Sequence, residues 1–123
     1  MFVFRLLGAI RSSVGALVLV LAILAGLSGD VLAAGDSQVT IVQPSDTMSW
    51  RYDPASLTVS VGSTVTWVNG GATSVTVTSP DGLFDSESIG PGGTFSFTFD
   101  TPGTYRYFCV PYPHMKGVIV VTP

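Results

Sequence analysis

Four residues near the C-terminal end of the chain have the chemistry of metal ligands. Cys109, the only cysteine, ends an aromatic run, and Met115 follows it in a proline-rich loop. The same loop carries Tyr112 and His114, and His114 is the only histidine of the chain. Thiolate and thioether ligands suit Cu(I), whereas a blue Cu(II) site adds two imidazoles to the thiolate. The loop therefore offers the sulfur donors of a copper site, but one molecule cannot supply the two imidazoles.

The N-terminal third of the chain has the pattern of a secretory signal. Two arginines precede an uninterrupted stretch of apolar or small residues over 14–27, and Val31 and Ala33 then give a small-residue cleavage pattern. The stretch is shorter than the roughly 20 residues that a spanning helix needs. We therefore predict a signal peptide over 1–33 and one exported domain over 34–123, periplasmic or extracellular, with no membrane span in the mature form. If the signal is not cleaved, the domain is membrane-tethered.

The composition of the exported part excludes several classes of function. Residues 34–123 carry three basic and seven acidic side chains, so no basic face is available for nucleic acid. A single cysteine cannot form a disulfide within the chain, so the fold depends on its apolar core. The single histidine has no nucleophile partner at a catalytic spacing, and we expect no enzymatic activity. Asp81, Asp85 and Glu87 are expected to be solvated loop charges.

Short runs of alternating apolar and polar residues recur about every ten residues of the exported part and are separated by turn residues. Such spacing, with many β-branched and aromatic residues, predicts an all-β fold of about eight strands. Because each strand buries one face, two sheets packed face to face are expected. The expected strands are 38–42, 48–52, 57–61, 65–69, 75–78, 95–99, 104–109 and 117–121.

With these segments in view, the chain resembles the cupredoxins, in particular the plastocyanin-like, amicyanin-like and halocyanin-like blue-copper electron carriers. The resemblance implies a Greek-key β-sandwich with a metal at one end, beneath the loops. It rests on YDPASLTVSVGSTVTWVN at 52–69, SPDGLFDS at 79–86, PGGTFSFTFDTPGTYRYFC at 91–109 and HMKGVIVV at 114–121.

The resemblance also implies which positions would hold copper. The family's cysteine and axial methionine correspond to Cys109 and Met115. The family's second histidine stands three residues after the cysteine, where this chain has Tyr112. The upstream histidine corresponds to Val75, or to Ser74 if the register slips by one residue. Both nitrogen positions are therefore vacated, and we do not expect a conventional blue site in this chain.

The loss of both histidines leaves two hypotheses. In the first, the protein is a metal-free or weakly metal-binding interaction module, and the Tyr112 end docks a redox or other exported partner. A simpler version of this hypothesis has Tyr112 and Val75 only filling the emptied site. In the second, the protein is a Cu(I) carrier or electron carrier that binds copper through Cys109 and Met115. His114 would join that site only if the loop rearranges, because in related loops this residue points toward solvent.

Overall fold

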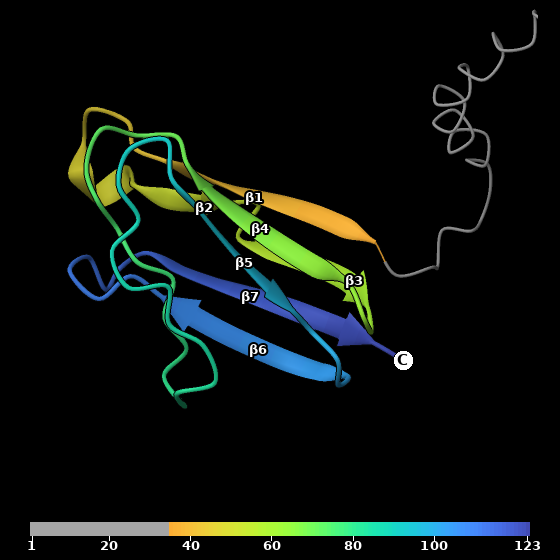
Figure 1. Cartoon of the computed structure of the whole chain (residues 1–123). Coiled ribbons are helices and arrows are strands. Elements are labelled where there is room, and N and C mark those ends of the chain that lie inside the picture. The colour runs from red at the N-terminus through yellow and green to blue at the C-terminus, as the bar shows by residue number, and fades with distance from the viewer. Residues whose placement is uncertain (1–34) are drawn as a thin grey trace, which may run out of the picture. The chain divides into compact units, whose positions relative to one another are not determined.

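The computed structural model describes residues 35–123, so the predicted signal over 1–33 lies outside the described part. This part forms two β-sheets with strand orders β2-β1-β4-β5 and β3-β7-β6 (Figure 1). The predicted all-β sandwich is thereby confirmed. No helix among residues 35–123 is long and apolar enough to cross a membrane. The elements are β1 (Asp36–Val42), the 3₁₀ turn η2 (Thr47–Ser49), β2 (Arg51–Asp53), β3 (Ser56–Ser60), β4 (Thr64–Asn69), β5 (Thr94–Thr98), β6 (Gly103–Phe108) and β7 (Lys116–Thr122).

The core lies between the two sheets, and strand alternation fills it. In β4, Val65, Trp67 and Asn69 are buried, while the residues between them are partly exposed. This is the period of two that places successive side chains on opposite faces of a sheet. Trp67 is fully buried, and its ring meets that of Tyr107 from β6 edge-on at a centroid distance of 5.3 Å. One aromatic from each sheet thus joins the two layers.

The strand pairing brings the candidate-site loop to one end of the sandwich. Strand β1 runs parallel to β4, and β3 runs parallel to β7. Strands β6 and β7 form an antiparallel ribbon that pairs Phe108 with Lys116. The loop between them therefore turns back on itself at the same end as η2, on the left of Figure 1.

Two of the expected strands were wrong in part. The segment 48–52 begins as a turn, because the Asp46 side chain accepts a hydrogen bond from the backbone N–H of Met48. Only Arg51–Asp53 then pairs as a strand. The segment 75–78 makes isolated bridges in place of a ladder. Side-chain acceptors replace ladder partners here, since the N–H of Val77 donates to the Ser86 hydroxyl at 2.8 Å.

Candidate metal centre

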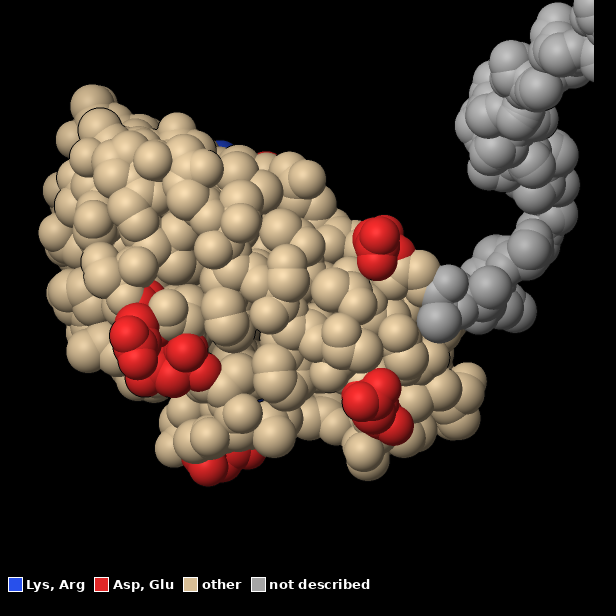
Figure 2. All heavy atoms as spheres, in the orientation of Figure 1, with Lys and Arg blue, Asp and Glu red and all other residues tan. Residues whose placement is uncertain are grey.

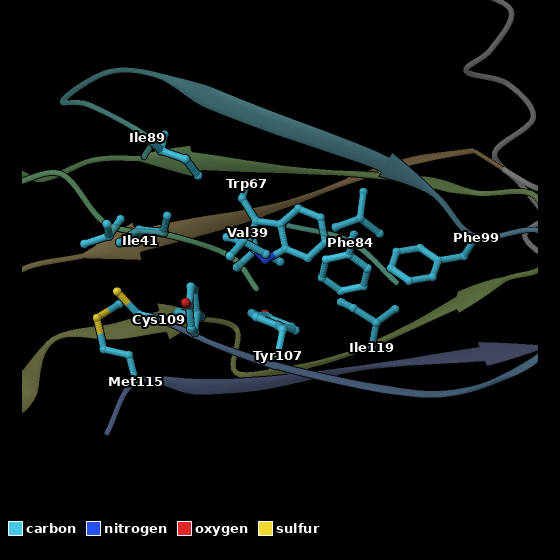
Figure 3. Packing of buried hydrophobic residues seen from close by; sticks show 14 of the residues in the cluster. Val39, Ile41, Trp67, Phe84, Ile89, Phe99, Tyr107, Cys109, Met115 and Ile119 are labelled. Atoms are coloured by element: carbon cyan, nitrogen blue, oxygen red, sulfur yellow. The ribbon is translucent and has the colours of Figure 1, made fainter. Parts of the chain in front are cut away.

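The two sulfur side chains singled out by the sequence lie together in the core. Cys109 and Met115 are 0% and 1% exposed, and the Cys109 N–H donates to the Met115 carbonyl at 3.2 Å. Figure 3 shows their sulfur atoms next to each other near Ile41, at the opposite end of the core from Phe99. The loop holds them there because its own backbone closes twice. The Tyr112 N–H donates to the Cys109 carbonyl, and the Met115 N–H donates to the Tyr112 carbonyl.

The segment that follows β4 forms a second wall beside the Cys109 sulfur. The backbone N–H of Thr76 donates to Cys109 Sγ across 3.4 Å. Val75, one residue earlier, is 1% exposed and exchanges two backbone hydrogen bonds with Ile89. Ser74 is exposed. Of the two candidate positions, Val75 is therefore the buried one, and its side chain has no donor atom to offer a metal.

Tyr112 lies against Trp50, which stands between η2 and β2. Its ring and that of Trp50 are 4.8 Å apart between centroids, at an interplanar angle of 60°. The indole N–H of Trp50 in turn donates to the Pro44 carbonyl at 2.8 Å. Both rings are partly buried. The Trp50–Tyr112 pair, which joins the β6–β7 loop to the segment between η2 and β2, thus fixes the phenol by ring packing.

His114 is bound to the η2 turn. Its Nε2 lies 3.0 Å from the backbone carbonyl oxygen of Thr47, and because a carbonyl only accepts, Nε2 must carry the proton. A protonated ring nitrogen cannot donate a lone pair to a metal. The ring is half-buried, so the expectation that it points freely into solvent needs this correction. A role for His114 as a ligand would therefore use its other ring nitrogen, Nδ1, with the hydrogen bond from Nε2 to Thr47 kept.

Two buried tyrosines set the polarity of the adjoining core. Burial, and then proximity to Cys109 and Tyr107, raises the pKa of Tyr52 far above its ordinary range. The Tyr52 hydroxyl donates to the Thr76 carbonyl at 2.6 Å. Burial likewise raises the pKa of Tyr107 to about 12, and the neighbouring Trp67 opposes that shift. Both phenols are neutral at physiological pH, so neither supplies a phenolate to the sulfur pair.

The residues present do not fit Cu(II). The donors that converge at this place are one thiol and one thioether, and no group of three His, Cys, Asp or Glu side chains within reach of a common metal occurs in residues 35–123. Cu(II) requires nitrogen donors beside the thiolate, whereas soft sulfur ligands suit Cu(I). Asp81, Asp85 and Glu87 are exposed. What the arrangement offers chemically is a buried pair of soft sulfur atoms.

Three residues that shape this site escaped the sequence analysis: Thr76, Trp50 and Thr47. The role of Thr76 could have been inferred from the placement of Val75. Thr76 is the next residue of the same segment, and its backbone N–H donates to the Cys109 thiol. No pattern in the sequence indicates that Trp50 packs on Tyr112, or that the Thr47 carbonyl accepts from His114, because both contacts join segments that lie far apart in the sequence.

The family model, the related sequences and the solved structures that match this chain are all cupredoxins or cupredoxin-like. Residues 16–121 match the family model described as a cupredoxin-like domain. Plastocyanin from Scenedesmus fuscus is 33% identical over 101 residues, which cover 68% of this chain and 98% of that protein. Halocyanin from Natronomonas pharaonis is 36% identical over 102 residues, 76% of this chain and 62% of halocyanin. The solved structure of a purple cupredoxin from Nitrosopumilus maritimus aligns with a TM-score of 0.64 and 32% identity, and covers 71% of this chain and all of that one.

Proposed function

The chain belongs to the cupredoxin-like family, and from that premise we propose that it is an exported, non-catalytic binding module whose copper site has lost its nitrogen ligands. One observation carries the proposal. Val75, which the resemblance places at the upstream histidine position, is a buried valine, and Tyr112, at the second position, packs on Trp50. Neither position offers an imidazole to an oxidised copper ion, and the only histidine, His114, donates from Nε2 to the Thr47 carbonyl.

The surface around this end supports a role in docking a partner. Met48 and Val110 are among the large hydrophobic residues that remain exposed, at 70% and 53%. They come from the η2 turn and from the β6–β7 loop, the two segments that the Trp50–Tyr112 pair joins. Exposed apolar side chains grouped in this way are typical of protein interaction sites. We therefore propose that this end docks an exported partner, redox or otherwise.

A specific observation favours one alternative. Because the thiol of Cys109 and the thioether of Met115 lie together in the core, the pair could bind Cu(I) as a two-coordinate ion. The protein would then carry Cu(I) or pass it on in the exported compartment. This alternative uses the same two residues as the family's cysteine and methionine, without an imidazole.

A copper titration separates the two functions. The purified full-length chain is titrated with Cu(II) in air and with Cu(I) under anaerobic conditions, and thermal unfolding and the visible spectrum are recorded. A ligand that binds only the native state adds about 2.7 kcal/mol of stability at 100 times its Kd, so even a colourless site is detected. The binding-module proposal expects no shift with either ion. An intense thiolate–Cu(II) absorption band would contradict both functions.

The alternative has its own signature in variants. A shift with Cu(I) alone, lost in Cys109→Ser and in Met115→Leu, would establish the Cu(I) site and overturn the metal-free proposal. Met48→Leu is the matched control, since Met48 is an exposed methionine of the η2 turn and should leave Cu(I) binding unchanged. His114→Gln tests whether the imidazole takes part, because a drop in Cu(I) affinity would mean that His114 binds the ion, for which its Nδ1 has a free lone pair.

A further inference from the structure

Strand β6 is an edge strand whose outer side is paired at one residue only. In the three-stranded sheet, β6 has β7 on one side (Figure 1). On the other side, Phe108 exchanges two backbone hydrogen bonds with Thr78, at 2.9 and 3.0 Å. The N–H and C=O groups of Phe108 therefore point away from β7. Because these directions alternate along an antiparallel strand, the backbone groups of Arg106 and Thr104 point to the same open edge.

The pairing stops because the chain opposite β6 turns away. After Thr78, the segment Ser79–Gly82 forms a tight turn in which the Gly82 N–H donates to the Ser79 carbonyl at 3.1 Å. Pro80 has no N–H to continue a ladder. Within residues 35–123, no backbone or side-chain group bonds the outward N–H and C=O groups of Thr104 and Arg106. A hollow of about 480 Å³, lined by Pro80, Asp81, Thr104 and Arg106, lies along this stretch.

The two basic residues of the β6–β7 ribbon are Arg106 on the edge strand and Lys116 on the central strand β7, whose ammonium donates to the Pro113 carbonyl. Arg106 stands opposite Val118, and Lys116 opposite Phe108, so the two cations are diagonal neighbours across the strands. Diagonal pairs lie about 7–8 Å apart, near enough for two long side chains to contact one group. Both are exposed, and Arg106 has no hydrogen bond or ion pair to any described residue. Two further hollows, of about 210 and 310 Å³, are each lined by both cations.

Arg106 and Lys116 form a local positive site on a chain that is negatively charged as a whole. The chain has a formal net charge of −3, and the face drawn in Figure 2 shows several acidic side chains with only a trace of blue at its margin. Asp81 at the rim of the edge hollow accepts a hydrogen bond from the Leu83 N–H, which lowers the pKa of its carboxyl group. Asp81 is therefore ionised at neutral pH, so the part of the hollow next to it disfavours an acidic side chain, and the favourable contacts for a carboxylate are Arg106 and Lys116.

We propose that this edge binds an extended acidic peptide segment of a partner protein, which adds to the sheet as a strand beside Thr104 and Arg106 and places a carboxylate on Arg106 and Lys116. Backbone pairing would supply the affinity, and the two cations the preference for acidic side chains, as in other strand-addition complexes. A positive charge on an edge strand discourages pairing with other positively charged strands. Acidic segments are therefore the strands that best complement this edge. The proposal goes beyond the docking end described above and uses none of its residues.

The test measures peptide binding to the full-length, ¹⁵N-labelled chain by NMR. The probe is a blocked octapeptide of alternating threonine and glutamate, and the control peptide has lysine in place of glutamate. We expect the glutamate peptide to shift the amide signals of Gly103–Phe108, most strongly those of Thr104 and Arg106, and the lysine peptide to bind at least about tenfold more weakly. No shift with the glutamate peptide, or equal binding of both peptides, would overturn the proposal.

Two variants separate strand addition from simple charge attraction. Thr104→Pro removes an N–H that bonds no described residue and is expected to abolish binding, with the fold checked by circular dichroism. Arg106→Glu should weaken binding at least about tenfold, whereas Arg51→Glu, at an exposed arginine of β2, should not. Binding that survives both Thr104→Pro and Arg106→Glu would refute the site. If the edge amides instead shift with protein concentration as dimers form, the occupant is a second copy and the peptide proposal is wrong.

Discussion

Restoring the two imidazoles should convert the protein into one that binds Cu(II). The variant is Val75→His with Tyr112→His. Val75 is 1% exposed, so its replacement removes about 1.5–3 kcal/mol of side-chain burial. Loss of the Trp50–Tyr112 ring contact at 4.8 Å removes about 0.5–1.5 kcal/mol more. Without metal, the double variant is therefore expected to be about 2–4.5 kcal/mol less stable than the natural chain.

Copper should return most of this loss. Binding to the native state alone contributes about 2.7 kcal/mol at 100 times the Kd, which nearly offsets the expected destabilisation. The assay combines chemical denaturation with and without Cu(II) and the visible spectrum, in which a thiolate–Cu(II) bond gives an intense band. The matched control is Val77→His with Tyr112→His, because Val77 is equally buried two residues further along the segment. The control should be destabilised to a similar degree and should gain neither stability nor colour.

One result would refute the placement of the site. If the Val75→His, Tyr112→His protein folds, as judged by its circular dichroism, but takes up no Cu(II), then the backbone beside the sulfur pair does not hold the two positions at ligand distance. Colour in the Val77→His control would refute the register instead.

Three further predictions concern the fold that carries the site. Gly117→Ala would drive a Cβ into the Tyr107 ring, so we expect the free energy of unfolding in denaturant to fall by about 1–3 kcal/mol. The free energy of unfolding should fall by about 2–3 kcal/mol as pH rises from about 10 to 12, because Tyr107 ionises near pH 10 in the unfolded chain but only near 12 in the folded one. Tyr107→Phe should remove this contribution to the pH dependence. Gln43→Ala should cost about 1–3 kcal/mol, since the Gln43 amide accepts from the Thr73 N–H and donates to Asn69 Oδ1, and unchanged unfolding would contradict the importance of this network.

The parts of the structure that sequence reasoning predicts well are those decided by neighbours in the chain. The strand around Trp67 was predicted because its alternation is visible in six consecutive residues. The sulfur pair was predicted because the loop between Cys109 and Met115 is short and closes through its own backbone hydrogen bonds. In both cases the information lies within a few residues of the feature.

The parts that sequence reasoning missed depend on partners brought in by the fold. The segment 75–78 has the composition of a strand, but two of its N–H groups, those of Thr76 and Val77, donate to the side chains of Cys109 and Ser86. Tyr112 is an aromatic residue in a loop by its sequence, and only the structure reveals its contact with Trp50. Hydrophobic periodicity and turn residues do not indicate which distant segments come into contact. The open edge of β6 also depends on where the chain opposite it turns away.

Thr76 has a consequence for how the family's site can change over time. Its carbonyl accepts from Tyr52, its hydroxyl accepts from the Val110 N–H at 2.9 Å, and its own N–H reaches the Cys109 sulfur. Only the last of these bonds involves a ligand side chain, that of Cys109. The backbone beside the site is therefore held by groups that do not depend on the side chains at positions 75, 112 and 115. Metal-ligating side chains could therefore be introduced at these positions one at a time, by evolution or by design.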